Sequence, residues 1–261
     1  MKLYQIDAFA SEVFRGNPAA VVTLDEWLSD AQMQAIAAEN NLAETAFFVP
    51  EDQGFHLRWF TPTQEVPLCG HATLASAFVV FTEIDSYLTT VGFQTLSGLL
   101  TVSRAGKMLQ MDFPKHDLVF AEAPPELLSG LRLPPREVYR TPPANPNYYA
   151  VYETETEVRA LAPDFAALAQ LDSQGVVVTA VGEKVDFVSR YFAPGLGIPE
   201  DPVTGSIHCA LVPYWAARLG KTEMHARQVS QRGGDLFCES GTDRVLISGY
   251  AVKYLEGELF I

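Results

Sequence analysis

The chain has few cysteines and lacks both long apolar runs and the common nucleotide-binding motifs. Its three cysteines include no Cys-x-x-Cys pair, which argues against a disulfide framework and favours a reducing cytoplasm. No Cys or His pair has zinc-ligand spacing, and no apolar run approaches the roughly 20 residues of a membrane span. A P-loop, a Gly-x-Gly-x-x-Gly turn and a Gly-x-Ser-x-Gly elbow are also absent. We therefore expect no metal and no membrane association.

Basic residues are scarce as well. The chain carries 18 Lys and Arg against 32 Asp and Glu, for a formal net charge of −14. Proteins that bind nucleic acids or anionic membranes gain much of their affinity from Lys and Arg, so neither partner is expected. A small anionic ligand is still compatible with this charge, because backbone N–H groups at a helix start attract anions whatever the net charge.

What the sequence does contain is a repeat. Residues 58–62 (RWFTP) recur half a chain later as residues 190–194 (RYFAP), and each copy leads through Pro and Gly into an apolar run. A length of 261 residues is enough for two small domains. The repeat predicts a duplicated domain whose two helix starts form an anion-binding site. The alternative is a chance similarity between two strand-turn-helix units, because the pattern is short.

The apolar runs, residues 72–81 and 207–219, have almost no polar face, and a helix of this kind must be buried on all sides. They predict an α+β fold of two similar domains, each a curled, mostly antiparallel sheet around a central helix. The expected domains are residues 1–115 and 116–261, with a return of the last strand to the first domain left open. The Pro-rich residues 124–146 are interpreted as the linker.

Polar residues suited to catalysis gather near the two helix starts. Cys69 and His71 stand at the first start, where a helix dipole lowers the pKa of a thiol, and Asp201 and Ser206 stand at the second. Glu44 opens a strand that follows a helix. Each also has a structural explanation: Asp201 and Ser206 are good helix caps, His71 a hydrogen-bonding residue, Cys69 a buried apolar residue and Glu44 a surface residue.

Five segments of the chain together resemble one known family. They are residues 16–22 (GNPAAVV), 41–47 (NLAETAF), 68–75 (LCGHATLA), 200–206 (EDPVTGS) and 231–235 (QRGGD). In this order they are similar to the phenazine biosynthesis-like (PhzF) family, within the fold group of diaminopimelate epimerase and proline racemase. The resemblance implies an active site in the cleft between two domains, usually a homodimer, and neither cofactor nor metal.

The resemblance also implies roles for single residues. Glu44 matches the catalytic carboxylate that moves a proton on and off carbon. His71, Asp201 and Ser206 match the other catalytic polar residues of the family. The residues expected to bind a carboxylate-bearing substrate are Gly70, Ala72, Gly205, Gly233 and Gly234.

Three functions follow as hypotheses. The first is a cofactor-independent isomerase in which Glu44 moves a proton, and with it a double bond, in a small carboxylate-bearing molecule. Fixed N–H dipoles at the helix starts would stabilise the negative charge left on the substrate. The second is an amino-acid epimerase or racemase that uses Cys69, although the second helix start has no matching cysteine. The third is a ligand-binding or interaction protein of the same fold without turnover.

Overall fold

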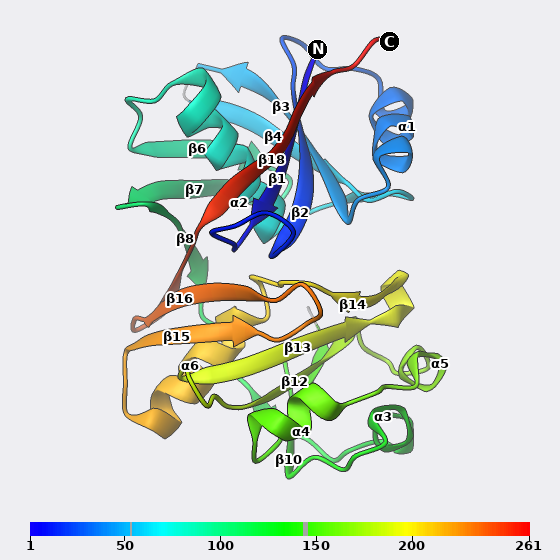
Figure 1. Ribbon diagram of the computed structural model, residues 1–261. Coiled ribbons are helices and arrows are strands. Elements are labelled where there is room, and N and C mark those ends of the chain that lie inside the picture. The colour runs from blue at the N-terminus through cyan, green and yellow to red at the C-terminus, as the bar shows by residue number, and fades with distance from the viewer. Residues whose placement is uncertain (53, 143–145) are drawn as a thin grey trace. The chain divides into compact units, whose positions relative to one another are not determined.

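The computed structural model describes residues 1–52, 54–142 and 146–261, which divide into two compact units (Figure 1). The first unit contains Met1–Asp112 and Ile247–Ile261, and the second contains Phe113–Leu246. The chain leaves the first unit within β8 (Met108–Pro114) and returns to it within β17 (Arg244–Gly249). The expected division after residue 115 stands next to the first crossing, and the second crossing is the return that the sequence left open.

The Pro-rich residues 124–146 are not a linker between the units. They lie within the second unit, where their described part forms α3 (Pro125–Leu131) and β10 (Glu137–Arg140). Pro125 occupies the first position of α3, where a missing backbone N–H costs the helix nothing. Residues 143–145 of this stretch lie outside the described residues.

The first unit is a curled sheet around one helix. Strands β2 and β3 run parallel, as do β4 and β6, and the pairs β18–β1, β1–β2, β3–β4, β6–β7 and β7–β8 are antiparallel. The sheet encloses α2, which contacts β1, β2, β3, β7 and β18, while α1 packs on β3 and β4. These elements are β1 (Lys2–Ala8), β2 (Asn17–Thr23), α1 (Asp30–Asn40), β3 (Glu44–Glu51), β4 (Gly54–Phe60), β5 (Glu65–Val66), α2 (Gly70–Val79), β6 (Thr90–Thr95), β7 (Gly98–Ala105) and β18 (Ala251–Glu258).

Helix α2 is the central helix that its composition predicts. Its residues Ala72, Leu74 and Ala75 have no exposed surface, because strands surround them. The helix begins at Gly70, two residues before the expected start, and continues as one π-helical turn over Val80–Ile84.

The second unit repeats the strand pairing of the first. From β10 to β16 the successive pairs are antiparallel, parallel, antiparallel, parallel and antiparallel, as they are from β1 to β7. Helix α6 takes the place of α2, and the predicted duplication and α+β fold class are confirmed. The elements are β9 (Val119–Phe120), β11 (Asn147–Val151), α4 (Glu155–Ala160), α5 (Phe165–Leu168), β12 (Gly175–Val181), β13 (Phe187–Ala193), a 3₁₀ turn (Pro194–Leu196), β14 (Ile198–Asp201), α6 (His208–Leu219), β15 (Glu223–Gln228) and β16 (Gly234–Ser240).

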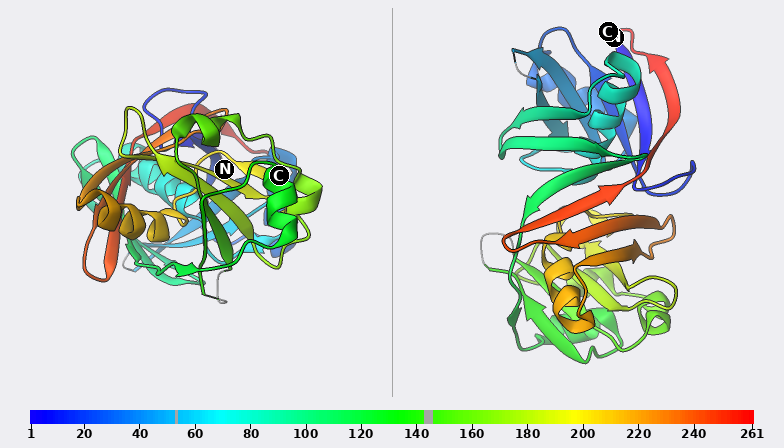
Figure 2. Two further views of the ribbon diagram at one scale, coloured as in Figure 1. Left: turned by 90° about the horizontal axis from the view of Figure 1, so that it is seen from below. Right: turned by 90° about the vertical axis from the view of Figure 1, so that its left-hand side faces the viewer.

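The two ends of the chain lie side by side in the first unit (Figure 2). Strand β18 pairs with β1, and beyond the pair the Leu259 N–H donates to the Met1 carbonyl oxygen at 2.9 Å. Within the described ranges, no helix combines the length and the apolar character that crossing a bilayer requires.

A glycine shapes the turn that leads into β2. Gly16 has φ +66°, and an added Cβ would press on the backbone carbonyl oxygen of Ala8. Gly106 has a similar φ of +64° but has open space around its Cα. We expect Gly106→Ala to lower the free energy of unfolding by about 1 kcal/mol, the cost of a left-handed alanine. Gly16→Ala should cost at least about 2 kcal/mol more, because backbone has to move. Urea unfolding of both variants measures the difference, and equal costs would contradict the steric explanation.

Candidate active site

Glu44, Cys69 and His71 meet at the start of α2. The Nε2 atom of His71 lies 3.2 Å from Glu44 Oε2, and its Nδ1 atom lies 3.5 Å from Cys69 Sγ. Asn17, a residue without a predicted role, completes the cluster, with its Nδ2 atom 3.2 Å from His71 Nδ1. The side chains of His71 and Glu44 are only 6% and 12% exposed. The structure thus brings together Glu44 and His71, two predicted catalytic residues, with Cys69 of the alternative hypothesis, and adds Asn17 as a further polar neighbour.

The start of the parallel pair β2–β3 places these side chains. Asn17 is the first residue of β2 and Glu44 the first of β3, and parallel neighbours begin at the same edge of a sheet. Asn41, in the left-handed region with φ 49°, ends α1, and Asn40 Nδ2 donates to Thr45 Oγ1 at 3.1 Å. These contacts fix the short turn between α1 and β3, which places Glu44 beside the start of α2.

Burial determines the charge of His71. It lowers the pKa of this imidazole from 6.5 to about 3, so the ring is neutral near pH 7. The approach to Glu44 is therefore not a pair of full charges. The distance of 3.2 Å is short, but His71 Nε2 is not aligned for a good hydrogen bond. We regard the contact as a close approach, because catalytic hydrogen bonds are often poorly aligned until substrate binds.

The first turn of α2 offers its backbone beside this cluster. Cys69 is the N-cap residue, and its side chain makes no capping hydrogen bond to the helix. Its carbonyl oxygen accepts instead, from Thr73 N at 3.1 Å and from Thr73 Oγ1 at 2.6 Å. Gly70 and Ala72 lie in this turn, at the positive end of the helix dipole. Their predicted role in binding a substrate carboxylate stays a prediction.

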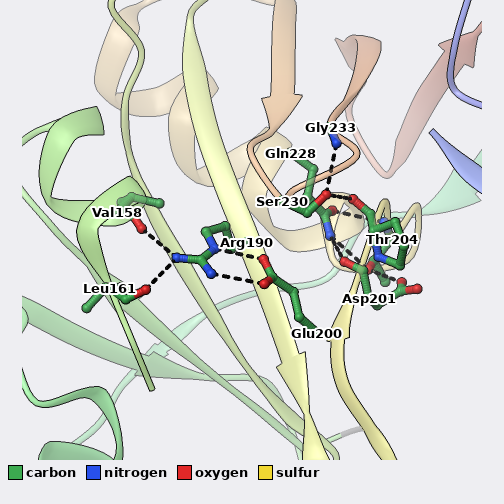
Figure 3. A network of polar contacts seen from close by, with 10 residues as sticks. Val158, Leu161, Arg190, Glu200, Asp201, Thr204, Gln228, Ser230 and Gly233 are labelled. Atoms are coloured by element: carbon green, nitrogen blue, oxygen red, sulfur yellow. Dashed lines mark hydrogen bonds and ion pairs between the residues drawn. The ribbon is translucent and has the colours of Figure 1, made fainter. Parts of the chain in front are cut away.

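In the second unit, Asp201 is held by two neighbours. It ends β14 with 8% of its surface exposed. Thr204 Oγ1 donates to Asp201 Oδ2, and Gln228 Nε2 donates to the Asp201 carbonyl oxygen at 2.7 Å (Figure 3). Gln228 is fully buried, and its Oε1 atom accepts from Thr204 N at 2.9 Å. The Gln228 side chain thus bonds to both ends of the turn between Asp201 and Thr204, and so fixes its shape.

Ser230 ties the same turn to a second one. Its Oγ atom donates to the Pro202 carbonyl oxygen at 2.7 Å and accepts from Gly233 N at 3.1 Å (Figure 3). Gly233 has φ +67°, which favours glycine, and Gly234 begins β16. Two predicted site residues, Asp201 and Gly233, are therefore parts of one hydrogen-bonded arrangement, and a third, Gly234, pairs with Gln228 across β15–β16. The sequence predicted neither Ser230 nor Gln228, although Gln228 is a polar residue at a strand end just before the QRGGD segment.

Gly205 and Ser206 lie in the turn that precedes α6. His208 N donates to the Gly205 carbonyl oxygen at 3.0 Å. The ring of His208 lies with Nδ1 2.8 Å from the Thr204 carbonyl oxygen, and burial lowers its pKa to about 4. A carbonyl oxygen only accepts, so this neutral ring carries its proton on Nδ1. The role of Ser206 stays a prediction.

The repeated arginines make the same ion pair in both units. Arg58 donates from Nε and Nη2 to the two carboxylate oxygens of Glu65, at 2.7 Å each. Arg190 does the same to Glu200, at 2.7 and 2.9 Å (Figure 3). Each pair joins a long strand to the short strand before the central helix, β4 to β5 and β13 to β14. The repeated arginines therefore hold in place the short strands that lead toward the two central helices.

Glu44, Cys69 and His71 also offer donor atoms of the types that zinc accepts. One atom from each lies within 4.8 Å of the others. Spacing along the chain does not reveal this cluster, because Glu44 is distant in sequence from Cys69 and His71. The amide of Asn17 lies beside Nδ1 of His71, so only Nε2 is left to face a metal, and Nε2 faces Glu44. The donor set fits a metal only in part.

The fold is that of the racemase and epimerase class. A probable proline racemase from Agrobacterium radiobacter has a TM-score of 0.63 with this chain at 11% identity, covering 100% of this chain and 93% of the other, which shows the fold alone. The family model for phenazine biosynthesis-like protein matches residues 6–257. This chain belongs to that family, the PhzF family.

Two relatives illustrate the similarity within the family. An uncharacterised isomerase of Pseudomonas aeruginosa is 49% identical over 261 residues, which cover 100% of this chain and 99% of the relative. The crystal structure of a PhzF-family protein from Enterococcus faecalis has 47% identity and a TM-score of 0.96, covering 100% of this chain and 99% of the other.

The Arg190 pair gives a test of the helix-start support. Arg190 is 12% exposed, and its Nη1 atom also donates to the carbonyl oxygens of Val158 and Leu161. Lysine cannot make the two parallel bonds to Glu200 and also reach these carbonyl oxygens. Arg190→Lys should therefore lower the free energy of unfolding by roughly 3 kcal/mol. The control is Arg132→Lys, at an exposed pair with Asp164, which should cost less than about 1 kcal/mol. Chemical denaturation measures both, and similar losses would refute the special role of Arg190.

The buried histidines predict a pH dependence of stability. The folded-state pKa values of His71 and His208, about 3 and about 4, lie below the ordinary 6.5. The unfolded chain therefore binds more protons, and stability is lost as the pH falls from about 6.5 toward 4. His208→Gln should flatten the plot of unfolding free energy against pH in this window. His56→Gln, at a more exposed histidine, is the control. An unchanged slope in His208→Gln would disprove the assignment.

Proposed function

We propose that this protein is a cofactor-independent isomerase that moves a proton on a small carboxylate-bearing substrate, with Glu44 as the general acid and base. The observation that supports this most directly is the buried approach of Glu44 to a neutral His71 at a helix start. Relatives that align over the whole chain carry the name isomerase, which agrees with the proposal.

The chemistry follows from the groups around Glu44. Its carboxylate takes a proton from a substrate carbon, and the electron pair left behind spreads toward the substrate carboxylate. Backbone N–H groups of Gly70 and Ala72 then stabilise that negative charge without reorganising. A neutral His71, aligned once substrate is bound, donates a hydrogen bond to Glu44 without adding a positive charge. Glu44 finally returns the proton to a second carbon, so the double bond shifts and no redox partner is needed.

The second unit enters the proposal through Asp201 and Ser206, with Gly205, Gly233 and Gly234. The contacts of Thr204 and Gln228 support a functional Asp201, since they hold this residue in one arrangement. A homodimer and a cytoplasmic location stay predictions of the sequence.

A second candidate function is epimerisation or racemisation through Cys69. The observation in its favour is the 3.5 Å separation of Cys69 Sγ from His71 Nδ1, which places the thiol in the same buried cluster as Glu44 and His71. Loss of activity in Cys69→Ser, with Glu44→Gln unaffected, would favour this candidate over the first. Tight binding of a carboxylate that survives Glu44→Gln, without any exchange, would favour a ligand-binding protein.

Isotope exchange in heavy water tests the proposal. The full chain is incubated with a panel of small unsaturated carboxylic acids and amino acids, and deuterium at carbon is followed by NMR. Glu44→Gln should reduce exchange by about 10²- to 10⁴-fold, the usual contribution of a general base. The control is Glu51→Gln, at the opposite end of β3, which should exchange like the unaltered protein. Exchange that is absent throughout the panel, or equal in Glu44→Gln, would rule the proposal out.

A further inference from the structure

The segment GNPAAVV contains a buried polar residue that the proposed chemistry does not use. Asn17 is fully buried, and its Nδ2 atom lies 3.2 Å from Nδ1 of His71. We propose that Asn17 is a positioning residue that holds His71 in the tautomer with its proton on Nε2, facing Glu44. The tautomer itself does not depend on the proposed function, whereas its consequence for the rate rests on it.

Donors and acceptors around the ring favour this tautomer. A neutral imidazole has one N–H and one bare nitrogen. On the Nε2 side the neighbour is the carboxylate of Glu44, which accepts when ionised, so the proton belongs on this side. On the Nδ1 side the neighbour is the amide nitrogen of Asn17, which only donates, so Nδ1 has to accept. The two sides thus agree.

Cys69 is the other neighbour of Nδ1, and it favours the same state. Its Sγ atom lies 3.5 Å from His71 Nδ1, and a thiol is a weak donor and a weak acceptor. The ring is neutral because burial lowers its pKa to about 3. The donors therefore point in one direction: Asn17 Nδ2 toward His71 Nδ1, and the N–H on Nε2 of His71 toward Glu44, which it approaches closely without a well-aligned hydrogen bond.

The backbone holds Asn17 where this bond requires it. Asn17 pairs with Ala8 across β1–β2, and Gly16 packs closely against the Ala8 carbonyl oxygen. Opposite rotation of the Asn17 amide would place Oδ1 beside His71 and favour a proton on Nδ1. Nε2 would then present a lone pair to Glu44, and the approach would become repulsive. The tautomer of His71 therefore reports which way the Asn17 amide is turned.

The duplicated fold provides two controls. Asn147 is the first residue of β11, the equivalent of β2, and its Oδ1 atom accepts from Tyr191 OH at 2.9 Å, with no histidine in that bond. His208 is a buried histidine whose Nδ1 faces a carbonyl oxygen, so its proton lies on Nδ1. It serves as the reference for the opposite tautomer within the same spectrum.

The experiment is NMR of the full chain labelled with ¹⁵N-histidine, with ring nitrogens followed through their couplings to ring protons. His71→Gln and His208→Gln assign the two signal sets. We expect His71 with its proton on Nε2 and His208 with its proton on Nδ1. Asn17→Asp replaces the donor by an acceptor, so it should move the His71 proton to Nδ1 or protonate both nitrogens. Asn147→Asp should leave His71 unchanged.

A proton on Nδ1 of His71 in the unaltered protein overturns the proposal, as does a His71 pattern unchanged in Asn17→Asp. The first result needs no variant to fold. Exchange kinetics are a separate readout: Asn17→Asp should lower kcat by about 10-fold or more, as loss of an orienting partner does, and Asn147→Asp should leave it unchanged. If Glu44→Gln exchanges normally while the expected tautomers are seen, the proposed function fails and the role of Asn17 stands.

Discussion

Two arginine–glutamate pairs hold the short strands that precede the central helices, and the candidate residues lie at or near the starts of those helices. A planar guanidinium bonded to both oxygens of a carboxylate permits little freedom. Each pair also stacks on an aromatic ring, Arg58 at 5.1 Å from the centre of Phe60 and Arg190 at 4.9 Å from that of Phe192. Each pair thereby holds the short strand, β5 or β14, against its long neighbour, β4 or β13. The turn that leads from the short strand to the central helix then starts from a fixed position. Side chains at the helix starts can then differ between the two units while the arginine–glutamate pairs stay the same.

The duplication has kept this support while its polar residues have diverged. Asn17 and Asn147 begin equivalent strands, yet the first turns its amide nitrogen to a histidine and the second turns its oxygen to Tyr191. The first helix start carries Cys69 and His71, and the second follows Asp201. Glu44 adds a carboxylate from β3 to the first set. Two units with the same order of strand pairings thus carry two chemically different sets of groups.

The fold could be predicted because its main signals are local. A helix that is apolar on all sides must be central, and two such helices after two copies of one strand imply a repeated domain. Glu44 and His71 could be named as candidates because they lie in recognisable segments. Asn17 and Gln228 were missed because their roles arise from contacts between residues distant along the chain. The linker was misplaced because prolines that open a helix, as in α3, look like prolines in a connection.

The pairing of β18 with β1 has a consequence for synthesis on the ribosome. The second unit is continuous, so it can close as soon as Leu246 has left the exit tunnel. Residues 1–112 of the first unit are made before the second unit but lack an edge strand until β18 (Ala251–Glu258) appears. Until then β1 presents unpaired backbone on one side, an edge to which other nascent chains can add. Of the two units, the first therefore begins earlier along the chain and is completed later.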